Sequence, residues 1–516
     1  TWPEVSMIRT VEQYLESLRD GRVLYCLGER VRDVASHPLL RNVIRSASMD
    51  YFFPNEPRYR DLFVAENEDG EEVNALFVSP KSPEDLLKRR EIFLTTWRTG
   101  GGTQLHCMGI DALEASRVVA DRMDNRLGTQ YVERVESYRK YLQKNDLGIT
   151  GAMTDVKGDR SLRPSKQETH QDYYVRVVDR QKEGIVVRGA KMHISSTPGA
   201  NEIIVMPCRA HGEEDKDYAV VFATPLNAQG VTIIASEPPM RETGDAALWD
   251  YPVSAASGHG ASECMIVFEN VFVPWERVFM CGEWEFSRDV TYTFATFHRL
   301  FGVCRMTTEL EILAGVASLV AEYNGIEKVS HVRDKLAWLA MYAEVVNVIG
   351  KASCMDCEKQ KDSDVVSPNM VYTNTAKYLF ADNYHQAVKT AQDICGGIAD
   401  TIPAYGDWSN PETRPLLEKY LSGKAGVPTE HRLKAIRLLK DVTNTHFLVG
   451  SIHGEGSLAA QRMFVYAGAD WGKFKAAAKR AAGIPGWEKN PIYGPLPAYP
   501  SCISSKMKSV DNSYKL

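Results

Sequence analysis

The sequence lacks several features that mark specialised classes of protein. No run of 18 or more apolar residues occurs, so no segment predicts a membrane-spanning helix. Basic residues are not in excess, because 61 Lys and Arg stand against 67 Asp and Glu, and attraction to nucleic acid or anionic membrane is therefore weak. The first residues have neither the basic nor the apolar region of a signal peptide. We expect a cytoplasmic protein that binds a small-molecule substrate and neither nucleic acid nor membrane.

Common cofactor and metal motifs are also missing. No G-x-G-x-x-G follows a predicted strand and no G-x-x-x-x-G-K-[ST] occurs, which argues against a nicotinamide or nucleotide-triphosphate enzyme. The ten cysteines are scattered, and the one close pair, Cys354 and Cys357, has no second Cys or His pair at zinc-finger spacing. The sequence predicts neither a disulfide framework nor a metal site.

The chain has the length and composition of a large globular protein. Its 516 residues exceed the roughly 100 to 200 of one domain. The hydrophobic period is helical at first, changes to short β-rich runs, and becomes helical again after Trp284. This segregated order predicts the α+β class rather than an alternating fold. We expect an N-terminal helical domain, a middle β-domain built as a barrel or a sandwich, a C-terminal helical bundle and an extended tail, at residues 1–148, 149–285, 286–486 and 487–516.

Individual strands and helix faces can be predicted within these parts. Turn residues separate the β-rich runs, as is typical of strands in a compact sheet. The runs are Tyr174 to Val178, Ile185 to Val187, Ile203 to Met206, Tyr218 to Phe222, Val231 to Ala235 and Met265 to Phe268. Two apolar stripes at helical spacing predict long bundle helices. They are Leu310, Leu313, Val316 and Val320, then Leu336, Leu339, Tyr342, Val345 and Ile349.

Two segments at the start and inside the β-region have the residues of a ligand-binding loop. In the stretch from Gly151 to Arg160, small residues let the backbone approach a planar ligand, Thr154 can donate to a ring heteroatom, and Lys157 offers charge to an anion. A polar loop with internal salt bridges would contain the same residues. The turn from His193 to Gly199 gathers three hydroxyls, which an ordinary Ser/Thr turn would also explain.

Three histidines have neighbours that suggest chemistry. His298 enters a long helix with Cys304 six residues later, partly on the same side. His106 lies beside Cys107. His453 begins a small-residue loop that could meet a phosphate or a ring edge. A structural role remains open for each, and for the last it is a helix cap.

Read together, these segments resemble one flavin-dependent superfamily, that of 4-hydroxyphenylacetate 3-hydroxylase and 4-hydroxybutyryl-CoA dehydratase. The resemblance covers nearly the whole chain and implies bound FAD, an acyl-CoA-dehydrogenase-like fold and a homotetramer built through the C-terminal helices. The strings that carry it are Gly151-Ala-Met-Thr-Asp-Val-Lys-Gly-Asp-Arg, Val187-Arg-Gly-Ala-Lys, Asp215-Lys-Asp-Tyr-Ala-Val, Phe268-Glu-Asn-Val-Phe-Val-Pro and Tyr323-Asn-Gly.

The resemblance also implies which residues contact the flavin. The first set lies in the stretch after residue 150, the second includes the hydroxyl that meets the isoalloxazine in the family, and the third is a further flavin-contacting loop. These residues are Gly151, Ala152, Met153, Thr154, Lys157, Gly158, Asp159 and Arg160, then Ser195 and Ser196, then Gly454, Glu455, Gly456 and Ser457.

The active-site positions depart from both branches of the superfamily. The phenol hydroxylases carry an Arg and a Tyr four residues apart and a His in the flavin loop, where this chain has Thr103, Cys107 and Gly151. The dehydratase binds an iron–sulfur cluster through three Cys and one His. Here Thr103 replaces the first Cys, Cys107 and His298 match, and Cys304 comes one residue early. Because such a cluster needs a full ligand set, none is expected. The residues expected to line the substrate are Thr103, Cys107, His193 and Cys304.

The first hypothesis is a two-component flavin monooxygenase. A separate reductase would supply reduced FAD, which with molecular oxygen would hydroxylate an aromatic or related organic substrate. His298 would orient substrate or move a proton, and Glu263, which falls where the dehydratase has a carboxylate, could serve as a base if buried. Two alternatives stay open: an FAD-dependent acyl-CoA dehydratase or isomerase, and a flavin-binding scaffold without catalysis.

Overall fold

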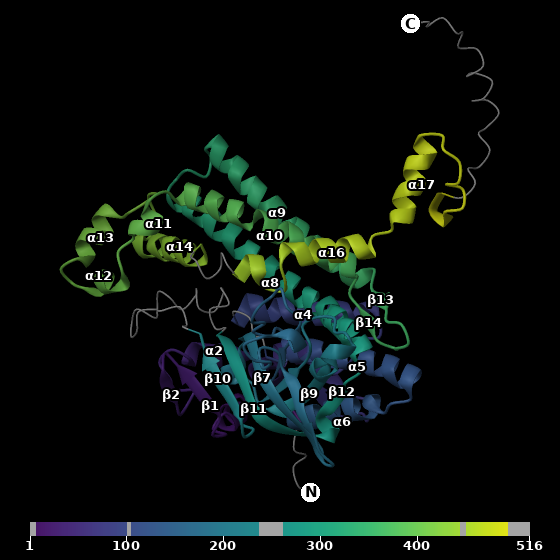
Figure 1. Ribbon diagram of the computed structural model, residues 1–516. Helices are drawn as coiled ribbons and strands as arrows, with labels where there is room; N and C mark the ends of the chain where they lie inside the picture. The colour runs from purple at the N-terminus through teal and green to yellow at the C-terminus, as the bar shows by residue number, and fades with distance from the viewer. Residues whose placement is uncertain (1–6, 101–104, 237–261, 444–449, 494–516) are drawn as a thin grey trace, which may run out of the picture. The chain divides into compact units, whose positions relative to one another are not determined.

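The structure is a computed structural model that describes residues 7–100, 105–236, 262–443 and 450–493 (Figure 1). The chain forms two compact units, Thr1–Arg462 and Met463–Leu516. None of the helices in the described ranges combines the length and the apolar composition that crossing a membrane requires.

The N-terminal part of the first unit is mainly helical, as its hydrophobic period predicts. Its first helix begins at Thr10, whose side chain accepts from the backbone N–H of Gln13 in a capping box. The elements are α1 Val11–Ser17, β1 Val23–Cys26, β2 Glu29–Val31, α2 Arg41–Phe52, α3 Pro57–Phe63, β3 Val64–Glu66, β4 Glu72–Asn74, α4 Pro83–Gly100, α5 Cys107–Leu127 and α6 Tyr131–Asn145. Strands β1 and β2 lie in the large sheet, β1 parallel to β10, although no strand is predicted there.

The middle of the chain folds into two sheets that share a hydrophobic core. Six strands run in the order β2-β1-β10-β11-β7-β6, and four in the order β12-β9-β8-β5. Phe222 of the smaller sheet packs edge-on against Phe268 of the larger, with ring centroids 5.9 Å apart. The strands are β5 Ile149–Ala152, β6 Arg176–Arg180, β7 Gly184–Ser195, β8 Glu202–Val205, β9 Val220–Pro225, β10 Val231–Ala235, β11 Glu263–Pro274 and β12 Val278–Cys281.

All six predicted β-runs are confirmed, as β6 to β11. The barrel alternative is not confirmed, because in the described residues neither sheet is closed. Two neighbouring inner faces bury their apolar side chains against each other instead, with a single core between them. Strand β5 adds a further difference, since it places Gly151 and Ala152 inside a sheet and not in a loop.

Long helices follow the sheets. Helix α8 packs against α4, α5, α9, α10 and α14 (Figure 1). The elements are α8 Ser287–Tyr323, α9 Ser330–Met355, β13 Glu358–Lys359, β14 Val366–Ser367, α10 Met370–Cys395, α11 Ile398–Thr401, α12 Tyr405–Ser409, α13 Arg414–Tyr420 and α14 Thr429–Val442. The stripe from Leu310 to Val320 is buried as predicted, but Val345 of the second stripe is 45% exposed on α9.

The C-terminal unit is small. Helix α16, Leu458–Gly468, crosses the boundary between the units, and α17 is Trp471–Ala481. The side chain of Asp470 caps α17 by accepting from the backbone N–H of Lys473 at 2.8 Å. Only residues up to 493 of the predicted tail lie in the described ranges, and the predicted division into four parts stays a proposal.

Helix α5 rests directly on strand β5 because both contribute a glycine at the contact. A Cβ atom on Gly109 would lie 2.0 Å from the side chain of Ile149, and one on Gly151 would lie 2.8 Å from the carbonyl oxygen of Met108. All four residues of β5 are buried. This close contact fixes the N-terminal half of α5 relative to the sheets, and the candidate site lies there.

Candidate functional site

The site begins at the ends of two paired strands. Ser195 ends β7 and lies in register with Glu263, the first residue of β11. The Ser195 hydroxyl donates to Glu263 Oε1 at 2.6 Å. Burial raises the pKa of Glu263, the neighbouring charge of Glu455 raises it further, and the Ser195 hydrogen bond and Arg305 oppose both. Glu263 is therefore partly buried and biased towards its neutral form, which suits a proton-transfer group.

A buried ion pair stands next to this carboxyl group. Arg305 of α8 donates from Nε and Nη2 to the two carboxylate oxygens of Glu455, at 3.2 and 2.9 Å, and also pairs with Glu309 one turn later. Burial alone would raise the pKa of Glu455, but Arg305 and Lys377 lower it to about 2. Glu263 and Glu455 thus lie within electrostatic range of each other, and their pKa values are shifted in opposite directions.

The loop that carries Glu455 is built onto α8 and α10. Glu455 has a left-handed backbone, with φ of 54°, and a Cβ atom on Gly302 of α8 would lie 2.7 Å from its side chain. Lys377 of α10 is fully buried and donates to the carbonyl oxygens of Ser451 and Ile452 at 2.8 and 3.2 Å. Burial lowers the pKa of Lys377 to about 8. The predicted loop Gly454 to Ser457 is therefore part of this site.

His298 lies on the same helix as Arg305, seven residues before it, which is two helical turns. Its ring is buried between Phe294 and Phe301, with centroid distances of 5.1 and 5.4 Å. Its Nδ1 atom lies 3.0 Å from Oδ2 of Asp111 on α5. His298 also lies within electrostatic range of Glu455 and helps to lower the pKa of Glu455, so it belongs to the same cluster.

The two predicted substrate cysteines point to different neighbours. Cys107 is fully buried at the start of α5, one turn before Asp111. The Cys304 thiol donates to the carbonyl oxygen of Arg90 on α4 at 3.9 Å. Burial raises the pKa of both thiols. Cys304 therefore faces α4, whereas His298 faces α5. Thr103 lies outside the described residues.

The ligand set of an iron–sulfur cluster does not fit this arrangement. The position two turns after His298 holds Arg305, which is committed to Glu455 and Glu309, and the nearby thiol of Cys304 is directed to α4. Across the described ranges, no group of three His, Cys, Asp or Glu side chains is close enough to hold a metal ion. Cys107 and His298 keep the residue types of the dehydratase but not the complete set.

His106 has a structural role. Its Nδ1 atom lies 3.1 Å from Asp50, and Nε2 lies 3.6 Å from Asp146. Burial would lower the pKa of His106, but hydrogen bonds to Asp146 and Asp50 raise it to about 9. The ring holds the segment before Cys107, where its own φ of 48° turns the chain into α5.

The predicted flavin segment 151–160 divides into a buried and an exposed half. Gly151 and Ala152 are strand residues under α5, and Met153 accepts a hydrogen bond at its carbonyl oxygen from Lys191 at 2.9 Å. Lys191 is buried and also pairs with Asp155 at 2.8 Å. Sequence reasoning missed Lys191 as an anchor, although its string belongs to the family resemblance.

The exposed half is a tight turn. Lys157 has a φ of 80° and Gly158 one of 53°, and a Cβ atom on Gly158 would lie 2.3 Å from Tyr173. Asp159 accepts from the Ser161 hydroxyl at 2.7 Å, while Arg160 is exposed to solvent. A charged side chain is thereby presented on a rigid turn next to the sheet edge.

The His193 turn meets this segment. Met192 donates its backbone N–H to the carbonyl oxygen of Thr154 at 2.9 Å, and partial burial and the charge of Lys157 lower the pKa of His193. His193 and Ser196 have φ values of 62° and 56°. Such backbones cost energy in non-glycine residues and concentrate at functional sites, so their presence here and at Glu455 supports the predicted binding segments.

The side chains present fit a flavin. Within the described residues, the hydroxyls of Thr154 and Ser196 have no hydrogen-bond partner, which leaves them available to a ring's heteroatoms. Lys157 and Arg160 offer the positive charge that a pyrophosphate requires. The Ser457 hydroxyl accepts from the backbone N–H of Ala460 at 3.3 Å and so caps the start of α16. The alternative prediction of a helix cap at this loop therefore also has support.

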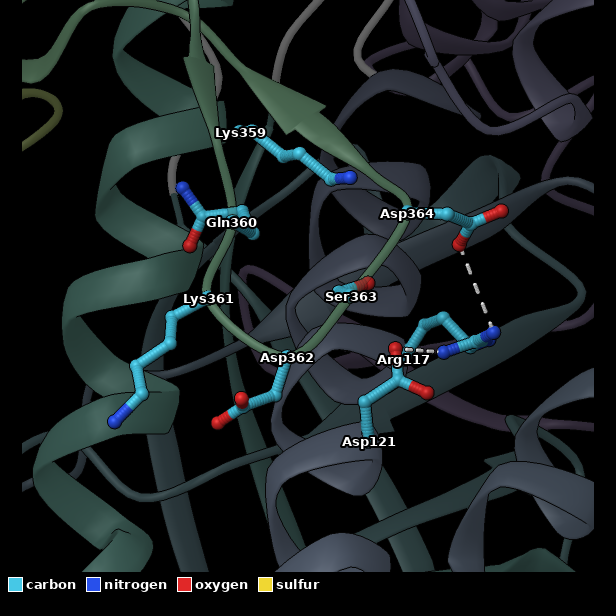
Figure 2. A pocket seen from close by; sticks show the side chains of 8 residues that line it. All are labelled: Arg117, Asp121, Lys359, Gln360, Lys361, Asp362, Ser363 and Asp364. Carbon is cyan, nitrogen blue, oxygen red and sulfur yellow. Dashed lines mark ion pairs between the residues drawn. The ribbon is translucent and has the colours of Figure 1, made fainter.

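A separate hollow of about 740 Å³ lies elsewhere on α5 (Figure 2). It is lined by Arg117 and Asp121 of that helix and by residues 359–364 of the β13–β14 hairpin. Arg117 is paired with Asp121 and Asp364 there. Its lining is almost entirely charged and contains none of the residues of the candidate site.

Comparisons with known proteins give consistent matches along the chain. Residues 10–280 match the family described as 4-hydroxyphenylacetate 3-hydroxylase N terminal, and residues 287–483 match its C terminal counterpart.

Individual relatives fall into two enzyme classes. The chain is 33% identical to 4-hydroxybutyryl-CoA dehydratase/vinylacetyl-CoA-Delta-isomerase of Clostridium aminobutyricum, covering 93% of this chain and all of that one. It is 30% identical to the oxygenase component of 4-hydroxyphenylacetate 3-monooxygenase of Thermus thermophilus, covering 86% and 89%. A crystal structure of such an oxygenase component complexed with FAD is similar, with a TM-score of 0.81, 27% identity, and coverage of 92% and 98%.

Proposed function

The chain belongs to the 4-hydroxyphenylacetate 3-hydroxylase family, and we propose that it is the oxygenase component of a two-component, FAD-dependent monooxygenase. In this proposal a separate reductase supplies reduced FAD, and the enzyme uses molecular oxygen to hydroxylate an aromatic or related organic substrate. The oxygenase component of 4-hydroxyphenylacetate 3-monooxygenase, 30% identical, is a relative of this class.

The observation that carries this proposal is the orientation of side chains on α8. Two turns after His298 the helix presents Arg305, paired with Glu455, and Cys304 turns to the carbonyl oxygen of Arg90 on α4. The site is therefore completed by an ion pair at the place where a metal-dependent dehydratase needs a thiolate. Ser195 and the loop Gly454 to Ser457, which we propose contact the flavin, lie close to the same ion pair.

Each residue of the site has a part in this function. Thr154, Ser195 and Ser196 would hold the flavin ring through their hydroxyls. Lys157 and Arg160 would bind its pyrophosphate. When bound, FAD supplies the redox chemistry that transfers oxygen to the substrate.

The acid–base groups act on the substrate. His298 would move a proton at the substrate's hydroxyl group from the edge of the ring that does not face Asp111. The rings of Phe294 and Phe301 on either side of it exclude water from that proton path. Cys107 and His193 would border the substrate, and Glu263 would exchange protons near the ion pair.

We further propose that the enzyme is a cytoplasmic homotetramer with the acyl-CoA-dehydrogenase-like arrangement of helical, β and helical domains. Helix α9 supports the assembly, because one of its faces exposes Met341, Val345 and Val348, spaced four and three residues apart, at 60%, 45% and 60%. Exposed apolar residues on one face of a helix of a large enzyme are typical of a contact between subunits.

A second candidate function is an acyl-CoA dehydratase or isomerase. Two observations favour it: the 33% identity to the dehydratase of Clostridium aminobutyricum over the whole of that enzyme, and the raised pKa of Glu263. A carboxyl group with a raised pKa is a suitable base for removing a proton α to a thioester carbonyl.

One experiment separates the two candidates. The purified full-length protein is supplied with FAD, a general flavin reductase, NADH and a panel of phenols under ¹⁸O₂. The masses of the products are then determined by mass spectrometry. Incorporation of one ¹⁸O atom that is lost in His298→Gln supports the monooxygenase. Anaerobic conversion of 4-hydroxybutyryl-CoA or vinylacetyl-CoA that requires Glu263, without ¹⁸O incorporation into any phenol, would overturn it.

A further inference from the structure

Asp111 is a buried carboxyl group that the sequence analysis does not single out. It lies on α5, is 1% exposed, and makes its one described hydrogen bond with Nδ1 of His298, at 3.0 Å. Two further charged groups face it, Arg89 and Glu114, but these are paired with each other at 3.2 Å. Among the described residues, His298 is therefore the hydrogen-bond partner of Asp111, and the Cys107 thiol one turn earlier lies within its electrostatic range.

The aromatic neighbours of His298 fix the plane of its ring, and Asp111 determines which ring nitrogen carries the hydrogen. Phe294 and Phe301 stack on the two faces of the imidazole, with interplanar angles of 18° and 22°, so they fix its plane. Stacking does not decide which ring nitrogen carries the hydrogen. A carboxylate 3.0 Å from Nδ1 does, because it accepts a hydrogen and cannot donate one.

We propose that Asp111 is a positioning residue that keeps the hydrogen of His298 on Nδ1, so that Nε2 is the nitrogen that exchanges a proton with the substrate. The inference rests on the proposed function for its catalytic meaning. The geometry itself does not depend on which substrate is used.

The burial of Asp111 makes this role specific. Taking a carboxylate out of water costs several kcal/mol unless a partner compensates it. Burial raises the pKa of Asp111, and the hydrogen bond and charge of His298 lower it. Two protonation patterns satisfy the same 3.0 Å contact: a carboxylate that accepts from Nδ1–H, as proposed, or a neutral carboxyl that donates to a bare Nδ1. They assign opposite roles to Nε2 and are therefore distinguishable.

The test is solid-state NMR of the full-length protein labelled with ¹⁵N-histidine, with His298 identified by the signal lost in His298→Gln. The proposal expects a hydrogen on Nδ1 in the unsubstituted protein. In Asp111→Leu, which removes the acceptor, that hydrogen should no longer be held there. Asp111→Asn serves the same purpose if the Leu variant fails to fold, and its weaker acceptor should shift the Nδ1–H proton signal upfield. A bare Nδ1 in the unsubstituted protein would overturn the proposal.

A matched control and a kinetic measurement complete the test. Asp121→Asn removes a carboxylate of the same helix that pairs with Arg117, and should leave the His298 signal unchanged. With a hydroxylation substrate, Asp111→Asn should lower kcat about 100-fold with KM changed less than about threefold. Combined with His298→Gln it should add no further loss, whereas losses that multiply would refute a role through His298.

The two failures look different. If the NMR result is as expected and no phenol is hydroxylated, the proposed function fails and the placement of the hydrogen stands. If hydroxylation proceeds and Nδ1 is bare or unaffected by substitution of Asp111, the function stands and the positioning role fails.

Discussion

At the scale of single residues, the surroundings of two neighbouring carboxyl groups shift their pKa values in opposite directions. Arg305 donates two hydrogen bonds to Glu455, from Nε and Nη2, and these favour the ionised form of Glu455. Glu263 accepts one hydrogen bond from the Ser195 hydroxyl, and its partial burial favours the neutral form. Removing a single donor should therefore change the protonation of Glu263 without disturbing Glu455.

Ser195→Ala tests this. The Ser195 hydroxyl donates to the ionised form of Glu263 and so lowers its pKa, against the effect of burial. The substitution should raise that pKa further, and neutral Glu263 should persist to higher pH. Infrared difference spectra of the carboxyl band, with Glu263→Gln as the blank, measure it. Ser196→Ala should cause no shift, and a shift to lower pH in Ser195→Ala would contradict the assignment.

Lys377 should make the free energy of unfolding depend on pH in the alkaline range. Its folded-state pKa is about 8, below the ordinary 10.5, because burial disfavours the charged form. Between these values the unfolded chain binds a proton at Lys377 that the folded protein has lost, so the contribution of Lys377 to the free energy of unfolding should rise as pH increases from about 8 to 10.5.

In Lys377→Met that rise should disappear, as measured by urea unfolding at several pH values. Lys328→Met, at an exposed site on the surface, is the control and should keep the rise. The same pH dependence of the unfolding free energy in Lys377→Met and in the unsubstituted protein would contradict the buried assignment of Lys377.

At the scale of secondary structure, an ion triad joins three helices. Glu114 of α5 is fully buried and pairs with Arg89 of α4 and Arg139 of α6, each at 3.2 Å. Glu114→Gln leaves two buried guanidinium groups short of a charge and should reduce the free energy of unfolding by about 3–5 kcal/mol. Glu136→Gln, which also removes a partner of Arg139 but at a half-exposed position, should cost less than about 1 kcal/mol in the same chemical denaturation experiment.

The contact of α5 with β5 gives a second reason for Gly151 besides flavin binding. A Cβ atom at Gly151 would press on Met108 and Ala112, so Gly151→Ala should cost about 1–3 kcal/mol even without flavin. Gly315→Ala, on α8 with no atom near its Cβ position, should be neutral or slightly stabilising. Thermal unfolding of flavin-free protein measures both changes. If Gly151→Ala leaves the stability unchanged, the residue has no packing role and only the cofactor-binding role remains.

Elements with a local pattern could be predicted from the sequence, and elements defined by distant partners could not. The run Val231 to Ala235 is apolar and flanked by turns, and it forms β10 with those bounds. Strand β1, Val23–Cys26, has no such signal, because its place depends on pairing with β10 some 200 residues later. The same reason explains why the helical first third contributes two strands to the large sheet.

The candidate site divides in the same way. The family resemblance assigned Ser195, Glu455 and His298 by position, and these residues lie in one cluster in the structure. Asp111 and Lys377 have no motif, because their meaning comes from partners far away in the chain. Asp111 is 187 residues from His298 in the chain, so the sequence alone does not show that the two side chains meet when the helices pack.

At the scale of the whole molecule, the exposed stripe on α9 should decide the assembly. Val345→Glu places a charge in the middle of that stripe, where a subunit contact would bury it. The variant should be smaller than the unsubstituted protein in size-exclusion chromatography with light scattering. Leu416→Glu, at an equally exposed apolar residue on α13, should leave the mass unchanged, and a tetramer that survives Val345→Glu would place the contact elsewhere.

The 150 residues that separate Arg305 from Glu455 also have a meaning during synthesis. At roughly 5–20 residues per second, the ribosome needs about 8–30 seconds to add the residues between Arg305 and Glu455. Until then the nascent chain carries Arg305 without that carboxylate, and Lys377 without the carbonyl oxygens of Ser451 and Ile452. These buried groups therefore gain their full set of partners only after the segment from Ser451 to Glu455 has been synthesised.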